Sequence, residues 1–174
     1  MSADTRLGGV DPQALVSVAI PAYNAADTIA QTLDSLLAQT HRNLDIVVVD
    51  DGSTDATWDV LQRYAGRITA IRQANAGIGA ARQASVQATR GDYIALLDAD
   101  DLCHPDRLEV QLRYLQTHPD ILLCGSDFGA FDDTGPLAAS YCGVYYARCS
   151  STRGGVRARY PHAETWTLRA DETA

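Results

Sequence analysis

The sequence predicts an α/β fold in which a mostly parallel sheet is covered by helices on both faces. Short apolar, strand-like segments alternate along the chain with segments whose apolar residues recur at helical spacing. The strand-like segments are apolar at nearly every position, which is typical of strands buried on both faces of a parallel sheet. Right-handed crossovers are expected to join successive strands.

Two strand–loop–helix units occupy the N-terminal part of the chain. Residues 16–20 form a short β-rich segment, and residues 44–49 form a second, strongly apolar one. The residues expected on the inner face of the first helix are Ile29, Leu33, Leu36 and Leu37. The second helix is expected over residues 55–64. Its inward-facing residues are Trp58, Leu61 and Tyr64.

The same alternation continues toward residue 125. Residues 68–71, 93–97 and 121–124 are three further candidate strands, and residues 78–89 form an Ala-rich helical segment. Pro105 suits the first turn of a last helix, because its missing N–H and fixed φ are tolerated there. The residues expected on the inner face of that helix are Leu108, Leu112 and Leu115.

The length and the pattern together predict one main domain. A chain of 174 residues with 46% hydrophobic content can bury one sizeable core. From Phe131 onward Gly, Ser, Tyr and Arg dominate, and no strong period is visible. We therefore expect an α/β domain over residues 1–130 and an irregular segment over residues 131–174.

The composition excludes several classes of function. A net charge of −8 argues against a nucleic-acid surface. All 14 basic residues are Arg, which excludes the Lys of a Walker phosphate loop or of a Schiff base. No apolar run approaches the roughly 20 residues that cross a bilayer, and no signal-peptide pattern is present, so we expect a soluble protein. The cysteines form no C-x-x-C pair, which favours free thiols in a reducing compartment such as the cytoplasm.

Three polar clusters directly follow predicted strands, at residues 21–24, 50–53 and 98–101. In an open parallel sheet the ligand site lies beyond the carboxyl ends of the strands. Each cluster belongs to a different strand, so their convergence on one edge is stronger evidence than any single cluster. We therefore expect a ligand site at this edge.

The third cluster is acidic. Asp98, Asp100 and Asp101 place three carboxylates within four residues, and such a group repels itself unless a cation joins it. Mg²⁺ or Mn²⁺ takes oxygen ligands and completes its shell with substrate phosphates, so the segment is interpreted as a metal bridge to a diphosphate. The alternative is a solvated turn in which Asp101 caps the helix near Pro105.

The first two clusters fit a nucleotide. Tyr23 offers an aromatic face for a nucleobase and Pro21 fixes the backbone beneath it, although either residue could simply pack. Asn24 could equally be a helix N-cap. One carboxylate of the Asp50–Asp51 pair could accept hydrogen bonds from a base or a ribose. The alternative buries Asp50 against backbone amides.

A glycine-bearing loop at residues 75–79 precedes the predicted helix over residues 78–89, and Arg82 lies one turn further. This arrangement lets the backbone approach a ligand at a helix N-terminus and places a guanidinium where it can meet phosphate. A plain turn remains an equal alternative, since short glycine patterns are common.

Taken together, these segments resemble the family-2 nucleotide-sugar glycosyltransferases, which have the GT-A fold. The resemblance rests on residues 16–24, residues 46–53, an N-x-G-x-x-x-A-R stretch at 75–82 and a D-x-D segment at 91–101. It covers roughly residues 14 to 125. It implies a GT-A type, Rossmann-like sheet, with residues 1–130 binding the nucleotide sugar and residues 131–174 forming an incomplete acceptor-side segment.

The resemblance also implies roles for single residues. Asp51 would contact uracil or another base, and Pro21 and Tyr23 would border it. Asp98 would meet the ribose or a Mn²⁺ or Mg²⁺ ion, and Asp100 would ligate that ion. The remaining residues expected to line the nucleotide are Ala22, Asn24, Asn75, Gly77, Arg82 and Ala99.

The implied activity is metal-dependent transfer of a sugar, with inversion, from a nucleotide diphosphate sugar to a saccharide or lipid-linked acceptor. The expected donor is a UDP-sugar. Such enzymes act in polysaccharide biosynthesis, in the cytoplasm or at the inner face of the membrane. Residues 154–169 resemble the family's acceptor-side segment, with Glu164 as candidate base, but Thr165 stands where an aspartate is expected. The alternative is therefore a catalytically impaired nucleotide-sugar-binding module or a fragment.

Two other classes of enzyme fit the residues less well. A nucleotidyltransferase shares the sheet and the metal chemistry but begins with a Gly-rich loop that carries Arg and Lys, whereas this chain has Tyr23-Asn24 and no Lys. An aspartate-based phosphatase with Asp98 as nucleophile would also need a Lys.

Overall fold

The structure is a computed structural model that describes residues 11–126, 128–132 and 135–140. The chain divides into two units, Met1–Cys124 and Gly125–Ala174. The described part of the first unit contains a parallel sheet of four strands in the order β3-β2-β1-β4. Its strands are β1 (Val16–Ala22), β2 (Leu44–Asp50), β3 (Thr69–Arg72) and β4 (Tyr93–Leu96).

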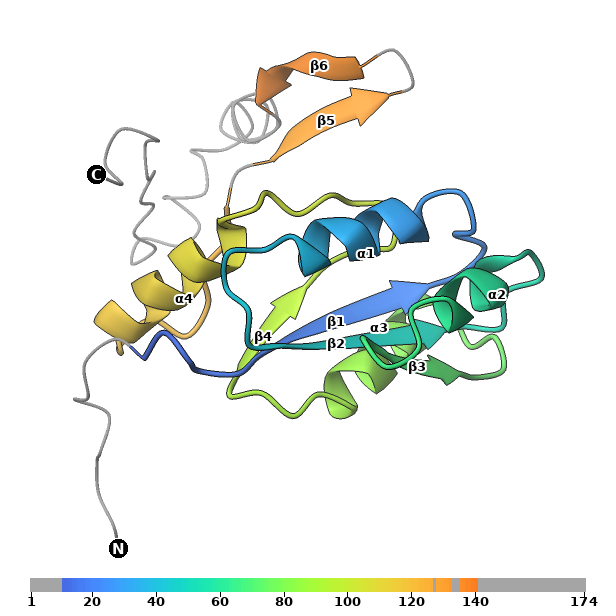
Figure 1. The fold of residues 1–174 in the computed structure, drawn as a ribbon, viewed down its shortest axis with the longest axis horizontal. Coiled ribbons are helices and arrows are strands. Elements are labelled where there is room, and N and C mark those ends of the chain that lie inside the picture. Colours follow the sequence, from blue (N-terminus) through green and yellow to red (C-terminus); the bar gives the residue numbers. More distant parts are fainter. Residues whose placement is uncertain (1–10, 127, 133–134, 141–174) are drawn as a thin grey trace, which may run out of the picture. The chain divides into compact units, whose positions relative to one another are not determined.

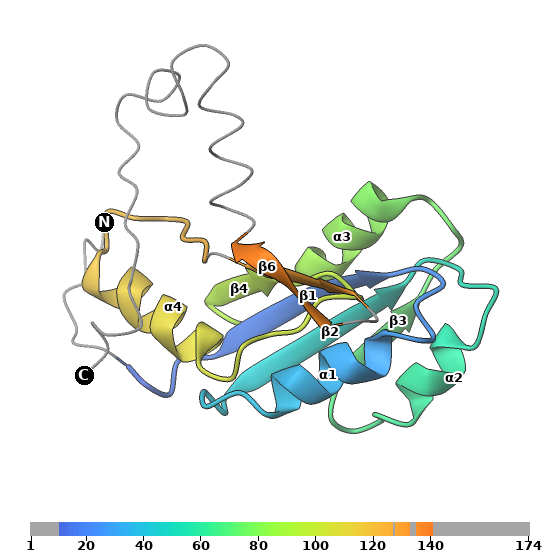
Figure 2. The same ribbon diagram turned by 90° about the horizontal axis from the view of Figure 1, so that it is seen from above.

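Helices cover both faces of this sheet, as the sequence predicts. The helices are α1 (Ile29–Leu37), α2 (Thr57–Gln62), α3 (Ile78–Gln87) and α4 (Arg107–Thr117). α1 and α2 lie against one face of the sheet, and α3 lies against the other (Figures 1 and 2). In the described part of the chain, none of the helices combines the length and the apolar character of a membrane span.

The core lies between the sheet and α1. Every residue of β1 is buried, which fits a strand that has helices on both sides. Ile29, Leu33 and Leu36 are fully buried, as their helical spacing predicts, and Leu37 is partly buried. On the sheet side they pack in one cluster with Val18, Ile20, Ile46 and Val48. β4 is an edge strand, and its alternate residues Ile94 and Leu96 are about half exposed.

The predicted boundaries differ most from the observed ones at the second helix, at residues 121–124 and at Pro105, which precedes the N-cap residue Asp106 and so lies outside α4. The second helix is shorter than residues 55–64, because the Asp55 carboxylate accepts hydrogen bonds from the backbone N–H and the hydroxyl of Thr57 and holds a turn there. The strand predicted at residues 121–124 is wrong. Leu122 and Leu123 are 87% and 86% exposed, and no described strand pairs with them. Four apolar residues do not form a strand unless a neighbouring strand is present to pair with their backbone N–H and C=O groups.

The second unit is described only in part. It contains an antiparallel pair of strands, β5 (Gly129–Asp132) and β6 (Gly135–Ser140). Gly135 has a φ of 122°, which a glycine adopts without strain. Most of the segment expected to be irregular, including Glu164, lies outside the described residues.

A buried hydrogen-bonded group fastens β4 to the centre of the sheet. The Asp45 carboxylate accepts hydrogen bonds from the Ser17 hydroxyl at 2.9 Å and from the Arg90 guanidinium at 2.7 Å. The Ser17 hydroxyl also accepts the N–H of Gly91 at 2.8 Å. A side chain at Gly91 has no room, since its Cβ would lie 2.6 Å from the carbonyl oxygen of Leu15. Burial acts to raise the pKa of Asp45, but the bonds from Arg90 and Ser17 outweigh it and hold the pKa below its usual value.

We expect Asp45→Asn to lower the free energy of unfolding by about 1–2 kcal/mol at pH 7, since the Arg90 partner is largely exposed and screened. A carboxyl with a lowered pKa stabilises the fold above its unfolded pKa and loses that contribution as pH falls through the folded pKa. The difference between wild type and variant should therefore be constant from pH 7 to about 5 and shrink below about pH 4. Urea unfolding measures it, with the exposed Asp120→Asn as the control. A difference that grows on acidification would contradict this account.

Candidate functional site

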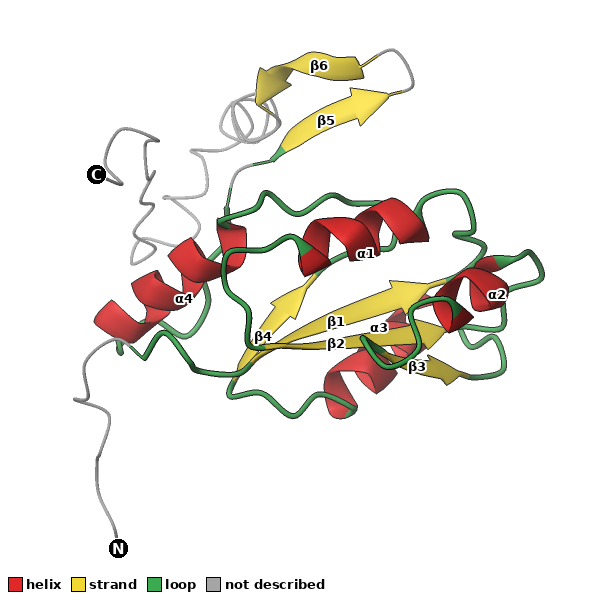
Figure 3. Ribbon diagram, viewed as in Figure 1, coloured by secondary structure: helices red, strands yellow, loops and turns green. Residues whose placement is uncertain are grey.

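The predicted polar clusters lie at one edge of the sheet, beyond the carboxyl ends of the strands. The parallel register aligns Ala22 with Asp50 and Asp50 with Arg72, so the loops after β1, β2 and β3 leave the sheet together. β4 ends beside β1, where the N–H of Leu97 bonds to the carbonyl of Ala19 at 3.3 Å. These loops connect the strand ends to the helices, as the loop segments of Figure 3 show.

Asn24 joins the first loop to the second. Its φ of +49° is in the left-handed region, which Asn tolerates better than most residues. Its backbone N–H donates to the Ser53 hydroxyl, and its side-chain oxygen accepts the N–H of Thr54, both at 2.9 Å. Asn24 therefore holds two loops together, and its role as a nucleotide ligand stays a prediction.

Asp50 is a structural residue of the second loop. Its carboxylate is fully buried and accepts the N–H of Ser53 at 2.9 Å. Its other oxygen lies 3.2 Å from Nε of Arg72 without a well-directed hydrogen bond. Arg72 in turn donates to the carbonyl of Ser53 and lies over the Trp58 ring. The alternative that buries Asp50 against backbone amides is the one the structure shows.

Asp51 holds the loop that follows β3. One carboxylate oxygen accepts the N–H of Ala76 at 2.9 Å and the side-chain amide of Gln73 at 2.7 Å. The other oxygen accepts the N–H of Gly77 at 2.8 Å. The bond from Ala76, with those from Gln73 and Gly77, holds the pKa of Asp51 below its usual value against the opposing effect of desolvation. A carboxylate has about four acceptor positions, so one is left unfilled by these bonds, in a residue that is 2% exposed.

The approach of these two loops requires glycine at position 52. Gly52 has a φ of +72°, and a Cβ on it would lie 2.8 Å from the backbone nitrogen of Asn75. Gly77 has a φ of +88° and stands at the N-terminus of α3, where nothing would obstruct a Cβ. Asn75 and Gly77 therefore lie beside Asp51, at the edge where the sequence predicts them.

Arg82 pairs with the acidic segment. Its guanidinium lies 2.5 Å from a carboxylate oxygen of Asp98, and the two side chains are 38% and 49% exposed. The pair brings a cation from α3 to the loop after β4. Because both groups are partly exposed, the pair contributes little to stability but places a movable positive charge next to Asp98.

The carboxylates of the acidic segment repel one another. Asp98 is half-buried and Asp100 is exposed, while Ala99 between them is buried. Partial removal from water, followed by the charges of Asp100 and Asp98, raises the pKa of the Asp101 carboxyl. Asp101 does not cap the last helix: Asp106 stands at the N-cap of α4. The capping alternative is therefore wrong.

Few side chains at this edge can act as metal ligands. Within the described ranges, no three or more His, Cys, Asp or Glu side chains are grouped so that they could hold a metal ion together. Two exposed or half-exposed carboxylates, Asp98 and Asp100, can supply hard oxygen ligands to a divalent cation that takes its other ligands from phosphate and water. The residues present fit such a shared site and not a closed protein cage.

The residues of the first loop differ in accessibility. Tyr23 is 52% exposed, so its ring face is open to a ligand. Pro21 and Ala22 are buried within β1 and can only border a ligand through the backbone. The sequence did not single out Gln73, Thr28 or Thr32 as site residues. The one available signal is that Thr28, Thr32, Ser35 and Gln39 recur at helical spacing between the apolar residues of α1.

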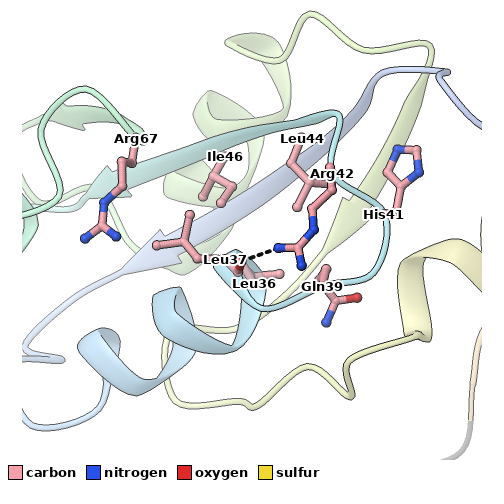
Figure 4. Close-up of a pocket in the computed structure, with 8 residues that line it drawn as sticks. All are labelled: Leu36, Leu37, Gln39, His41, Arg42, Leu44, Ile46 and Arg67. Carbon is pink, nitrogen blue, oxygen red and sulfur yellow. Dashed lines mark hydrogen bonds between the residues drawn. The ribbon is translucent and has the colours of Figure 1, made fainter.

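One pocket among the described residues lies at the opposite edge of the sheet. It encloses roughly 240 Å³ between the end of α1 and the start of β2 (Figure 4). The Arg42 guanidinium at its rim donates to the carbonyl of Leu37 at 3.1 Å. The lining residues are Leu36, Leu37, Gln39, His41, Arg42, Leu44, Ile46 and Arg67. None of the predicted site residues contributes to it.

The chain matches Glycosyl transferase family 2 over residues 17–167 and belongs to this family. EpsH of Bacillus subtilis (strain 168) is 40% identical over 124 residues, which are 69% of this chain and 36% of that protein. The Escherichia coli UDP-Glc:alpha-D-GlcNAc-diphosphoundecaprenol beta-1,3-glucosyltransferase WfaP is 39% identical over 105 residues, or 59% of this chain and 42% of that protein. The chain therefore spans about two fifths of the length of these relatives.

Solved structures agree with the fold. S. aureus TarS 1–349 in complex with UDP-GlcNAc has a TM-score of 0.57 and 27% identity, over 60% of this chain and 32% of that one. The mannosyltransferase PcManGT from Pyrobaculum calidifontis, in complex with GDP-Man and Mn²⁺, has a TM-score of 0.56 and 26% identity, over 68% of this chain and 38% of that one. These similarities confirm the predicted GT-A type, mostly parallel sheet.

Proposed function

We propose that the described edge of the sheet binds the nucleotide diphosphate of a sugar donor. We further propose that the protein transfers the sugar, with inversion, to a saccharide or lipid-linked acceptor. The observation that supports this most strongly is that the loops after β1, β2 and β4, which carry different kinds of side chain, meet at one edge. They carry the open ring of Tyr23, the fixed carboxylate of Asp51 and the acidic pair Asp98 and Asp100.

We infer that the base lies against Tyr23 and reaches the remaining acceptor position of Asp51. An ionised carboxylate prefers a base that presents a ring N–H, as uracil and guanine both do. TarS has been solved with UDP-GlcNAc, and the name of WfaP specifies UDP-Glc, which supports a UDP-sugar. PcManGT binds GDP-Man, so the nucleotide has to be tested directly.

Asp98 and Asp100 would hold a Mn²⁺ or Mg²⁺ ion, as the Mn²⁺ in the PcManGT structure supports. The ion supplies positive charge to the departing nucleoside diphosphate. The Arg82 guanidinium neutralises the charge of Asp98 in this structure. When a metal ion neutralises Asp98 instead, Arg82 is placed to pair with a phosphate. Asn75 and Gly77 would present backbone to the same ligand.

Glu164 remains the candidate base, and it lies outside the described residues. A base there would take the proton of an acceptor hydroxyl, which attacks the anomeric carbon on the face opposite the departing diphosphate. The WfaP acceptor is linked to undecaprenol diphosphate, which supports a place at the cytoplasmic face of a membrane for this protein. Thr165 favours a second candidate, a module that binds the donor without transferring the sugar.

Isothermal titration of the chain with UDP, GDP and ADP, each with Mn²⁺ and with EDTA, tests the proposal. We expect UDP to bind about tenfold or more tightly than the others, and Mn²⁺ to strengthen it, because the metal joins two carboxylates to the diphosphate. UMP serves as the control, since it lacks the second phosphate and should gain little from the metal. Absence of binding by all three diphosphates would refute the proposal. Incubation of UDP-sugars with a saccharide or lipid-linked acceptor then separates the transferase from the binding module.

A further inference from the structure

A row of polar side chains on α1 faces the segment that joins β4 to α4. Thr28 at the N-cap, Thr32 and Ser35 are spaced four and three residues apart, so they share one side of the helix, and Gln39 follows two residues after its end. The joining segment runs alongside α1 in both views (Figures 1 and 2). Thr32 and Gln39 are fully buried, so this row is not a solvated face.

The first two members of the row bond to the same atom. The hydroxyls of Thr28 and Thr32 both lie 3.0 Å from the carbonyl oxygen of Ala99. Each hydroxyl has a second acceptor, the carbonyl of Ala25 for Thr28 and that of Thr28 for Thr32, but these distances are longer, at 3.4 Å and 3.5 Å. The bonds to Ala99 are therefore the preferred ones, and they use both lone pairs of that carbonyl.

The rest of the row continues the attachment toward α4. The Ser35 hydroxyl accepts the N–H of Cys103 at 3.0 Å. The Gln39 side chain donates to the carbonyl of His104 at 2.7 Å and accepts the N–H of Leu108 at 3.2 Å. The latter bond satisfies an amide in the first turn of α4, whose N-cap residue provides no side-chain bond. The segment is thus fixed at both ends by α1.

Ala99 lies between the two proposed metal ligands. Fixing its carbonyl fixes the plane of the peptide that leads to Asp100, and so the directions in which Asp98 and Asp100 project. The carboxylates themselves are exposed or half-exposed. Arg82 pairs with that of Asp98, and within the segment the N–H of Asp101 bonds to the carbonyl of Asp98 at 3.2 Å. We propose that Thr28 and Thr32 are positioning residues that hold the acidic segment in the arrangement a divalent cation needs. This inference rests on the proposed metal role of Asp98 and Asp100.

The test uses two readouts on the same variants of the whole chain. Thr32→Val removes the hydroxyl and keeps the shape, while Thr32→Ser restores the hydroxyl. Thr89→Val is the matched control, since the Thr89 hydroxyl bonds to a carbonyl at the end of α3, away from the edge. Hydrogen exchange of the peptide containing residues 98–103 reports positioning without any metal. Titration with UDP, once in Mn²⁺ and once in EDTA, reports how positioning changes the gain of UDP affinity that the metal provides.

In Thr32→Val we expect faster exchange in residues 98–103 and an about fivefold smaller gain of UDP affinity from Mn²⁺, the factor for one net hydrogen bond. UDP affinity in EDTA should stay within about twofold, and Thr32→Ser should recover both readouts. Unchanged exchange in Thr32→Val, or the same change in Thr89→Val, overturns the positioning role. A third outcome separates the two proposals. If exchange is faster in Thr32→Val but Mn²⁺ does not raise the UDP affinity of the wild type, the hydroxyl does anchor the segment and the proposed metal function is refuted.

Discussion

Asp100→Ala is expected to abolish the gain in UDP affinity that Mn²⁺ provides, a loss of about tenfold or more. Asp100 is exposed, so its removal leaves no cavity and should barely change the free energy of unfolding. The remaining carboxylate, Asp98, is already paired with Arg82 and would have to hold the ion alone. Calorimetric titration of UDP with Mn²⁺ and with EDTA measures the effect.

The EDTA titration is the internal control for that variant. UDP affinity without metal should equal that of wild type or exceed it slightly, because one negative charge near the diphosphate is gone. Asp120→Ala, which removes an exposed carboxylate three residues after α4, controls for the loss of a charge elsewhere. If Asp100→Ala kept the full Mn²⁺ gain, the metal would not be held at this segment.

Asp51→Asn should weaken UDP binding about tenfold or more both with and without metal, which distinguishes it from Asp100→Ala. The Asp51 carboxylate accepts three hydrogen bonds from the loop after β3 and retains one acceptor position for the base. An amide keeps the shape but turns one acceptor oxygen into a donor, which opposes the N–H of Ala76 or of Gly77. Titration in EDTA shows the loss most directly.

Asp45→Asn is the matched control, since Asp45 is also a buried, hydrogen-bonded aspartate but lies near the amino end of β2, whereas Asp51 follows its carboxyl end. It should lower stability and leave UDP affinity unchanged. Wild-type affinity in Asp51→Asn would mean that neither the carboxylate nor the loop it holds takes part in binding.

The sheet could be predicted because its two central strands are apolar at most positions and the loops that follow the strands contain Gly, Asn or Asp. β1 and β2 show this most clearly, since nearly all of their residues are buried, including Ser17 and Asp45, which bond to each other. The error at residues 121–124 has the same origin. Those residues are as apolar as a strand, but pairing depends on a neighbour, which local sequence does not specify.

The meeting of the polar loops was also predictable, since a parallel sheet brings strand ends to one edge. What the side chains do there was not. The partners of Asp51, the ion pair of Arg82 with Asp98 and the two hydroxyls on Ala99 all join residues at least 16 positions apart. Such contacts follow from how α1 and α3 pack, so no local pattern contains them.

The most direct test of the account is where a Mn²⁺–UDP complex binds. Mn²⁺ broadens the NMR signals of nearby nuclei, so amide spectra should lose intensity together at Tyr23, Gly52, Gly77 and Asp100, with Mg²⁺–UDP as the diamagnetic reference. Amides around the pocket at the opposite edge, such as Arg42, should keep theirs. Broadening restricted to one loop, or centred elsewhere on the chain, would contradict the claim that separate loops form one cation-bridged diphosphate site.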